Sequence, residues 1–383
     1  MSFTNHTFSD SSVFTPYLSL DLERFQANVQ RLNTRLADHK VVLRPHLKTV
    51  KSVPAARVLA PEDNTPVTVS TLREAEVFAA EGYREILYAV GIAPQKLTRV
   101  CHLNADAPIV TVILDSQAQA EAVIAASEEF KAVIPVMIEV DCDGHRGGLR
   151  ADDPAVITIA SSLVHAGIPF KGVMLHAGES YGLAVPEKLA AAAEQERATA
   201  VQAAENIRAA GIDCPVVSVG STPTAFFAEN LTGVTEVRAG VFSFFDLVMA
   251  GVGVCKPSDI ALSVVTTVIG HRKDKGWIMT DSGWMALSRD RGTAKQQQDQ
   301  GYGMVCNMAG EPYTDLLVAD VSQEHGILAI RSGSDQPLPD LPVGTQLRVL
   351  PNHACATAAQ HDQYRVESTI DGFAEIWPRI RGW

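Results

Sequence analysis

The sequence predicts an α/β protein in which a (β/α)8 barrel is followed by a domain of β-strands. Between about residue 40 and residue 245, short runs rich in β-branched residues alternate with alanine- and glutamate-rich helical patterns. Strands that alternate with helices in this way pair in parallel, and eight such units suggest a closed barrel. After about residue 250, strand patterns follow one another with turn residues between them and little helix. An open doubly wound sheet is the alternative for the first part.

The predicted elements follow in order along the chain. A helix comes first, because apolar residues recur at three- and four-residue spacing over residues 22–36. The apolar runs that predict the barrel strands span residues 40–49, 66–71, 85–91, 109–116, 133–141, 171–180, 215–221 and 235–242. Helical patterns lie between them, and that of residues 186–211 ends at a glycine. Strand patterns of the second domain cover residues 263–272, 276–283, 316–330 and 345–357. The predicted domains are therefore residues 18–250, a barrel, and residues 251–383 together with residues 1–17, a β-domain.

Composition limits the classes of partner. The chain has 383 residues with 32 Lys and Arg against 44 Asp and Glu, a net charge of -12, which gives no support to binding of nucleic acid or an anionic membrane. The first fourteen residues lack the pattern of a signal peptide, and no apolar stretch reaches the length of a spanning helix. We therefore expect a soluble, cytoplasmic protein with a small-molecule partner.

Polar residues at the ends of barrel strands are the candidates for chemistry. In LRPHLKTVKS, residues 43–52, strand parity places Arg44, His46 and Lys48 on one face. A lysine rarely lies inside a protein unless it is paired or has a covalent role, and burial lowers its pKa towards nucleophilic competence. Spacing alone leaves a second reading open, that Lys48 is a solvated loop lysine, as Lys51 is expected to be.

Later strand ends add further candidates. Three interpretations of the next segment, EVDCDGHRGGLRADD at residues 139–153, are open. It is a metal site, a loop that holds Arg146 against an anionic or planar ligand, or a plain surface loop. His176 directly follows a buried run, and Tyr181 comes soon after. The last two strands end in VSVGSTPTA and EVRAGVFSFFD, where glycine and hydroxyl residues favour a phosphate site of the kind that barrels form there. A plain helix cap explains the first of these two loops and leaves the second unexplained.

In the β-domain, LPNHACAT places His353 and Cys355 two residues apart, so in a strand their side chains share a face. Imidazole and thiolate together suit zinc. Two ligands are too few for a closed structural site. The pair is either a coincidence or part of an open, catalytic site that water and substrate complete.

Taken together, the motifs resemble a known family. RPHLKT, DGHR, HAGESY, VSVGSTPT, EVRAG, DSGWMALSRDRG, QEHG and PNHACAT, spread over nearly the whole chain, are similar to those of fold type III pyridoxal-phosphate enzymes, which share an alanine-racemase-like barrel. More narrowly, they resemble the branch of metal-dependent D-serine dehydratases and D-threonine aldolases.

The resemblance implies roles for particular residues. The lysine of RPHLKT, Lys48, would hold pyridoxal 5'-phosphate as a Schiff base, and the arginine of DGHR, Arg146, would contact the phenolic oxygen or the ring. His176 and Tyr181 would line the cofactor, and Arg238 would face the pyridine nitrogen as in alanine racemases. Phosphate contacts are implied for Ser221, Thr222, Gly240 and Val241. His353 and Cys355 would bind a divalent metal, which is zinc, manganese, magnesium or cobalt.

The resemblance also implies an activity. Aldolases of this branch carry aspartate two residues after the histidine and dehydratases carry cysteine, as Cys355 stands here. The expected enzyme is a lyase of the ammonia-lyase type that converts a D-3-hydroxyamino acid, D-threo-3-hydroxyaspartate or D-serine, to a 2-oxo acid and ammonia. Arg289 or Arg291 is the candidate partner for a second substrate carboxylate. An aldolase releasing glycine and a non-catalytic pyridoxal-phosphate carrier are the alternatives, and a homodimer is expected from the family.

Overall fold

A computed structural model describes residues 14–368, 370 and 372–383. Residues 1–13, which include most of the segment examined for a signal peptide, lie outside the described residues. The described chain divides into two compact units, one formed by Val241–Arg379 with the chain up to Gln30, and the other by Arg31–Gly240 with Ile380–Trp383. The limits expected from the sequence, 18–250 and 251–383 with 1–17, stay a prediction. Helix α1 (Leu22–His39) spans the division at its middle.

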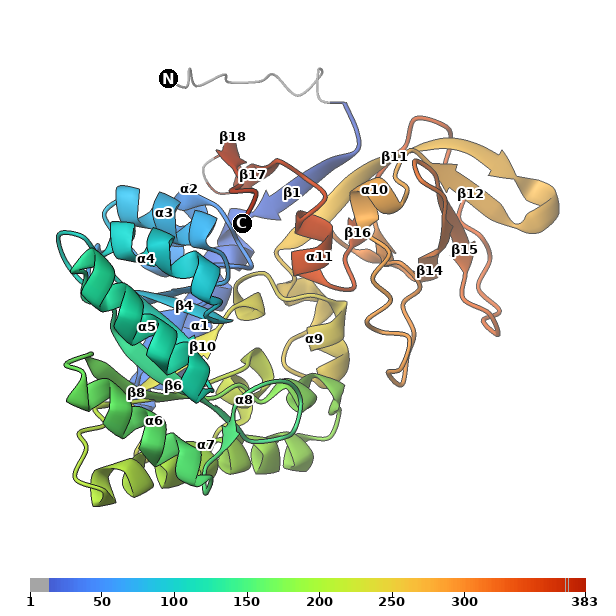
Figure 1. Cartoon of the computed structure of the whole chain (residues 1–383). Helices are drawn as coiled ribbons and strands as arrows, with labels where there is room; N and C mark the ends of the chain where they lie inside the picture. The colour runs from blue at the N-terminus through green and yellow to red at the C-terminus, as the bar shows by residue number, and fades with distance from the viewer. Residues whose placement is uncertain (1–13, 369, 371) are drawn as a thin grey trace. The chain divides into compact units, whose positions relative to one another are not determined.

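The unit formed by residues 31–240 is a barrel of parallel strands (Figure 1). Its strands are β2 (Val42–Pro45), β3 (Val67–Val69), β4 (Ile86–Gly91), β5 (Val110–Leu114), β6 (Val136–Asp141), β8 (Phe170–Met174), β9 (Val216–Val219) and β10 (Glu236–Ala239). They pair in the order β2, β10, β9, β8, β6, β5, β4, β3. A parallel bridge between His46 and Thr68 joins the two ends of this order. The predicted barrel is thus confirmed, and the open sheet is excluded.

Helices alternate with these strands, as the sequence pattern predicts. They are α2 (Val53–Leu59), α3 (Leu72–Ala80), α4 (Leu97–Leu103), α5 (Gln117–Phe130), α6 (Pro154–His165), α7 (Pro186–Ala209) and α8 (Thr222–Phe227), and the two-residue strand β7 (Leu149–Arg150) pairs with β6. Several helices begin at side chains that accept a backbone N–H of the first turn, as Thr71, Ser116 and Asp153 do.

The inside of the barrel is filled rather than hollow. Leu87, Ile113, Met137 and Met174, from four neighbouring strands, form a buried apolar cluster. Polar side chains from β2, β9 and β10 form a second group, in which the Arg44 guanidinium contacts the Glu236 carboxylate at 2.8 Å. A packed core of this kind leaves the strand ends as the places where a ligand is contacted.

The other unit is built of strands that pair mainly antiparallel. It contains β1 (Tyr17–Asp21), α9 (Leu247–Val252), β11 (Leu262–Arg272), β12 (Trp277–Thr280), α10 (Trp284–Leu287), β13 (Met304–Cys306), β14 (Pro312–Val321), β15 (Gly326–Ile330), β16 (Gln346–Leu350), α11 (Ala354–Ala358), β17 (Gln363–Ser368) and β18 (Phe373–Pro378). Strands β12, β15, β14, β13 and β16 pair in that order, and β11 pairs with both β16 and β12, which closes a small barrel. Strand β1 joins β11 to β17.

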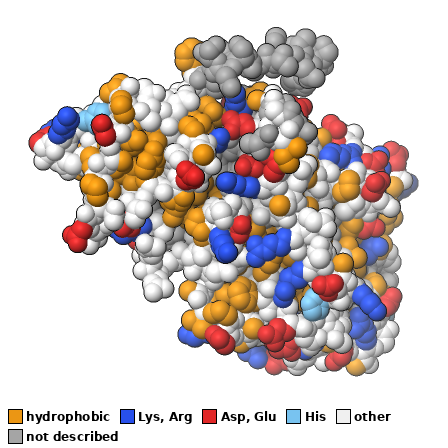
Figure 2. All heavy atoms as spheres, turned by 180° about the vertical axis from the view of Figure 1, so that it is seen from behind, with side chains coloured by type: hydrophobic (Ala, Val, Ile, Leu, Met, Phe, Trp, Pro, Cys, Tyr) orange, Lys and Arg blue, Asp and Glu red, His pale blue; other side chains and the backbone are white. Residues whose placement is uncertain are grey.

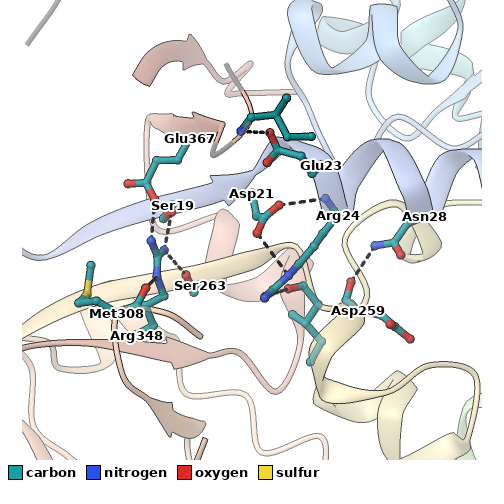
Figure 3. Close-up of polar contacts among 12 residues, drawn as sticks. Ser19, Asp21, Glu23, Arg24, Asn28, Asp259, Ser263, Met308, Arg348 and Glu367 are labelled. Atoms are coloured by element: carbon teal, nitrogen blue, oxygen red, sulfur yellow. Dashed lines mark hydrogen bonds and ion pairs between the residues drawn. The ribbon is translucent and has the colours of Figure 1, made fainter. Parts of the chain in front are cut away.

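A partly buried arginine, Arg348, ties these strands together (Figure 3). Arg348 of β16 donates to the hydroxyl of Ser19 at 2.8 Å and to that of Ser263 at 3.2 Å. Its guanidinium also contacts the Glu367 carboxylate at 2.7 Å and donates to the carbonyl of Met308 at 3.0 Å. The four partners come from different segments, so this side chain holds β1, β11 and β17 against β16.

Acidic and basic side chains are interspersed over the face drawn in Figure 2, and hydrophobic side chains gather on the part that the β-strand unit forms. In that unit Ile269 of β11 is 43% exposed, and Met279 of β12 pairs with Ile327 of β15. No helix of the described residues is both long enough and apolar enough to cross a membrane.

Candidate active site

Lys48 lies on a turn that directly follows β2. The backbone N–H of His46 donates to Ala239 O at 2.7 Å and that of Leu47 to Thr68 O at 2.8 Å, so the ends of β10 and β3 fix the start of the turn. Leu47 is fully buried, whereas Lys48 is exposed. The structure therefore places the Lys48 side chain at the strand-end face of the barrel, outside the packed core.

Lys51 differs from the sequence-based expectation of a solvated lysine. Its side chain is only 23% exposed, and its ammonium group lies 3.5 Å from the carboxylate of Glu74, which is fully buried. Strand parity cannot anticipate this, because the turn reverses the chain and Lys51 adopts a positive φ of 41°. Lys51 is thus a partner of a buried acid, and Lys48 is the more exposed of the two lysines.

Two neutral histidines belong to the same end of the barrel. Burial and the nearby Lys48 lower the pKa of His46 well below its usual value. Burial also lowers the pKa of His176, to about 3. The Nδ1 of His176 lies 2.9 Å from Gly220 O, and because a carbonyl only accepts, Nδ1 carries the hydrogen. The Nε2 of His176 is therefore an acceptor.

The loop after β6 presents Arg146. Its side chain is 58% exposed, and its Nη2 is 3.5 Å from the carboxylate of Glu139. Burial raises the pKa of Glu139, and Arg146 opposes that rise. His145, the other candidate ligand in this loop, contacts Glu179 at 2.8 Å. Among the described residues no group of three or more His, Cys, Asp or Glu side chains is arranged to hold a metal, so a metal reading of this loop gains no support.

The loops after β9 and β10 carry the residues expected to bind phosphate. Ser221 caps α8, accepting from Thr224 N at 3.2 Å, and its hydroxyl lies 2.8 Å from that of Ser180. The N–H of Thr222 points to the Tyr181 hydroxyl at 3.4 Å, so Tyr181 reaches this loop. A Cβ on Gly240 would lie 2.7 Å from the Thr49 hydroxyl, so a larger residue would require the Thr49 side chain to move. Val241 comes next, at the start of a 3-10 turn (Val241–Ser243) where the second unit begins.

Arg238 is buried in the polar group of the barrel. Its guanidinium donates to the Ser218 hydroxyl and to Leu175 O. Ser218 in turn donates to Glu236 at 2.6 Å, and Glu236 also pairs with Arg44. Burial lowers the pKa of Arg238, while the neighbouring Glu236 raises it. The arginine is therefore held rigidly by β9, β10 and the end of β8.

His353 and Cys355 lie together in the β-strand unit, although not in a strand. Strand β16 ends at Leu350, and His353 is the N-cap residue before α11, with Cys355 in the first turn of that helix. The expectation that both lie in a strand is therefore wrong, because Pro351 follows the last strand residue and interrupts the ladder. Burial alone would lower the pKa of His353, but hydrogen bonds with Asp290 and Cys355 raise it to about 11.

Two family models match the chain. The alanine racemase N-terminal domain matches residues 20–247, and the serine dehydratase domain matches residues 261–367. The chain belongs to the fold type III pyridoxal-phosphate enzymes. Enzymes of this family depend on pyridoxal phosphate.

Relatives of this fold type III enzyme include lyases acting on D-amino acids. It is 50% identical to the D-threo-3-hydroxyaspartate dehydratase of Delftia sp. strain HT23, over 96% of this chain and 98% of that protein. It is 28% identical to the D-serine dehydratase of Dictyostelium discoideum, over 88% and 89% of the two chains. A 3-hydroxy-D-aspartate aldolase of Paracoccus denitrificans is 25% identical over 96% and 92%.

The solved structure of the Delftia dehydratase superposes with a TM-score of 0.94 at 50% identity, covering 97% of this chain and 99% of that one. Two variants of a D-threo-3-hydroxyaspartate dehydratase also superpose on this chain, each with a TM-score of 0.94. One carries alanine in place of a histidine, and the other carries alanine in place of a cysteine. The two replaced positions are two residues apart, and the cysteine variant is described as the metal-free form.

Two acidic residues of this fold type III enzyme were not identified from the sequence. Glu196, buried on α7, accepts the N–H of Ala177 at 3.0 Å and that of Gly220 at 2.9 Å, so it joins the loops after β8 and β9. Its place in the apolar stripe of α7, between Ala193 and Ala200, was a usable signal. Asp290 contacts His353 at 2.7 Å, and only its proximity to the other charged residues of LSRDRG marked it.

Proposed function

We propose that this protein is a pyridoxal-phosphate- and divalent-metal-dependent dehydratase that converts D-threo-3-hydroxyaspartate, and also D-serine, to a 2-oxo acid and ammonia. The observation that carries the proposal is the contact between a histidine and a cysteine two residues apart, His353 and Cys355, in a chain whose first barrel strand ends in an exposed lysine, Lys48. The 50% identity to a dehydratase of this substrate supports it.

The residues at the strand ends fit pyridoxal phosphate. Lys48 is exposed on the turn after β2 and can hold the cofactor through its amine, and Arg146 is exposed on the loop after β6. The close approach at Gly240 and the N-terminus of α8, which the loop after β9 feeds, suit a phosphate. We propose cofactor contacts for Arg146, His176, Tyr181, Ser221, Thr222, Arg238, Gly240 and Val241. When bound, pyridoxal phosphate supplies an electron sink for the electrons left on the substrate α-carbon.

Three residues of the chain have proposed roles in proton transfer and charge stabilisation. Lys48 Nζ would hold the cofactor and would also be the base that accepts the proton of the substrate α-carbon. His176 stays neutral because its pKa is about 3, and its Nε2 is oriented as an acceptor by the Nδ1 contact with Gly220. Arg238, buried and doubly hydrogen-bonded, would supply a fixed positive charge to the cofactor ring.

His353 and Cys355 form an open metal site. A nitrogen and a sulfur ligand suit zinc best among zinc, manganese, magnesium and cobalt. When bound, the metal supplies Lewis acidity to the β-hydroxyl, which is a poor leaving group by itself. The substrate loses water, and hydrolysis then gives ammonia with oxaloacetate from 3-hydroxyaspartate or pyruvate from D-serine.

A second substrate carboxylate requires a cation. Arg291 is already paired with Asp299 at 2.5 Å and lies over the ring of Tyr302. Arg289 is exposed, with its guanidinium 6.0 Å from the centre of the Trp284 ring. We therefore propose Arg289, rather than Arg291, as the residue that recognises 3-hydroxyaspartate.

The proposals for the oligomeric state and the cellular location rest on the family. We propose a homodimer in the cytoplasm, and the apolar side chains exposed on the β-strand unit, such as Ile269, support a partner surface there. Light scattering coupled to gel filtration tests the dimer, and a single monomer mass at micromolar concentration would refute it.

The test of the activity is a panel of D-3-hydroxyamino acids assayed for ammonia and 2-oxo acid, with and without a chelator. We expect ammonia from 3-hydroxyaspartate and D-serine, loss of activity on chelation and recovery with added zinc or manganese. Glycine with an aldehyde as the products would instead show an aldolase. A Lys48→Ala variant that kept both the Schiff-base absorbance and the activity would overturn the assignment of Lys48.

A further inference from the structure

Asp290 contacts the candidate metal-binding histidine from a loop that follows α10. Its Oδ2 lies 2.7 Å from His353 Nδ1, and both side chains are partly exposed, at 34% and 43%. A carboxylate only accepts when ionised, so Nδ1 carries the hydrogen. This commits one of the two ring nitrogens to Asp290.

The other ring nitrogen is thereby assigned. His353 also has a side-chain hydrogen bond with Cys355. Because Nδ1 is already committed to Asp290, this second bond falls to Nε2, so Nε2 and the Cys355 sulfur face each other. A nitrogen and a sulfur that share one proton are suitably placed to share one cation in its stead.

Further hydrogen bonds fix the loop that carries Asp290. The side-chain amide of Asn352 donates to Asp290 O at 3.3 Å, and the Thr293 hydroxyl donates to Asn352 Oδ1 at 3.1 Å. Asp290 N donates to the Ser288 hydroxyl at 3.0 Å. The loop of residues 288–293 and the segment beginning at Asn352 are thus held in one register.

A second carboxylate anchors the backbone on the other side of His353. Asp246 is buried, caps α9 by accepting Met249 N at 2.9 Å, and accepts Ala354 N at 2.9 Å with its other oxygen. The peptide that follows His353 therefore cannot shift without breaking this contact. Asp246 holds the backbone, and Asp290 orients the ring.

We propose that Asp290 is a positioning residue for the metal: it holds His353 so that Nε2, beside Cys355, is the nitrogen offered to a divalent cation. The inference rests on the proposed function, because it requires His353 and Cys355 to bind a metal. A carboxylate on the far nitrogen of a metal-binding histidine fixes the ring orientation and raises its basicity. Losing it typically weakens metal affinity by about 10- to 100-fold.

The experiment uses the full chain with pyridoxal phosphate bound, stripped of metal by a chelator and titrated with zinc against a chromogenic zinc chelator. Asp290→Ala is expected to raise the zinc Kd by about 10- to 100-fold. Asp290→Asn keeps an oxygen that can accept from Nδ1 and is expected to fall between wild type and Asp290→Ala. Asp274→Asn and Asp274→Ala, changes to a carboxylate that pairs with Arg272 and is 63% exposed, are the matched controls and should leave the Kd unchanged.

Two further measurements separate positioning from folding. The melting temperature of the metal-free protein and the Schiff-base absorbance should be the same in wild type and both Asp290 variants. Unchanged zinc affinity in Asp290→Ala, with wild type binding zinc, would overturn the inference alone. If wild type itself binds no zinc and its turnover resists chelation, the metal-dependent function fails and the inference falls with it. If Asp290→Ala is unfolded, the comparison of Asp290→Asn with Asp274→Asn decides.

Discussion

Replacement of Glu196 by alanine should destabilise the barrel and loosen two loops that belong to the proposed cofactor site. The carboxylate is buried on α7, and one of its oxygens accepts both the Ala177 N–H and the Gly220 N–H. The carbonyl of Gly220 in turn accepts from His176, so the effect extends to a candidate cofactor residue.

The size of the effect follows from these two contacts. A buried donor left without a partner costs about 1–3 kcal/mol, so two of them cost about 2–6 kcal/mol. Relief of the burial of the carboxylate, which raises the pKa of Glu196, offsets part of this cost. If that offset leaves a net cost of about 2–4 kcal/mol, a slope of about 2 kcal/mol per molar urea lowers the unfolding midpoint by roughly 1–2 M.

Urea unfolding of the cofactor-free chain, followed by far-ultraviolet circular dichroism, measures the shift, and titration with pyridoxal phosphate measures the loss of affinity. Glu194→Ala is the matched control on the same helix, because Glu194 is 50% exposed and pairs only at the surface with Arg197. That pair should contribute less than about 1 kcal/mol. Equal midpoints for Glu196→Ala and Glu194→Ala would refute the reasoning.

Three other predictions concern charge. Burial raises the pKa of Glu196 in the folded chain, so this carboxyl loses its proton at a lower pH in the unfolded chain than in the folded chain. Wild type should therefore lose stability relative to Glu196→Gln as pH rises from about pH 4 to the folded-state pKa of Glu196. Urea midpoints of the two proteins that stay parallel across pH 4–8 would contradict this. Arg44→Met removes the ion-pair partner of the buried Glu236 carboxylate and should lower the free energy of unfolding by about 3–5 kcal/mol. The double variant Arg44→Met with Glu236→Gln should lose less, and urea midpoints of the single and double variants measure the difference. Arg289→Ala should lower kcat/KM for D-threo-3-hydroxyaspartate by about 10- to 100-fold, mainly by raising KM, and should leave kcat/KM for D-serine unchanged. An equal loss of kcat/KM on both substrates would reject a role of Arg289 in substrate recognition.

The barrel could be predicted from the sequence because its signal is local and repeated. Each apolar run that predicts a strand coincides with a strand of the structure, and the helix of residues 186–211 appears as α7. The position of His353 and Cys355 could be predicted only in part. Their spacing indicated a shared face in a strand, but Pro351 ends the strand before them, and the two side chains meet at the start of α11 instead.

The side-chain pairs that could not be predicted from the sequence are contacts between distant segments. Asp290 and His353 are 63 positions apart, and the pairing depends on how a loop without a periodic pattern folds back. The contrast between Lys48 and Lys51 likewise depends on Glu74 from α3, which no strand pattern can reveal. Glu196 was accessible in principle, since a glutamate in an apolar helical stripe needs buried partners.

The bridge between His46 and Thr68 gives the turn at Lys48 a further significance. It joins strands that are neighbours in the sequence but occupy opposite ends of the pairing order, so it is the seam at which the cylinder closes. Lys48 lies two residues beyond that seam. A chain whose sheet has failed to close would lack the fixed turn that carries this lysine. If Lys48 holds the cofactor as proposed, binding of the cofactor would therefore report a completely folded barrel.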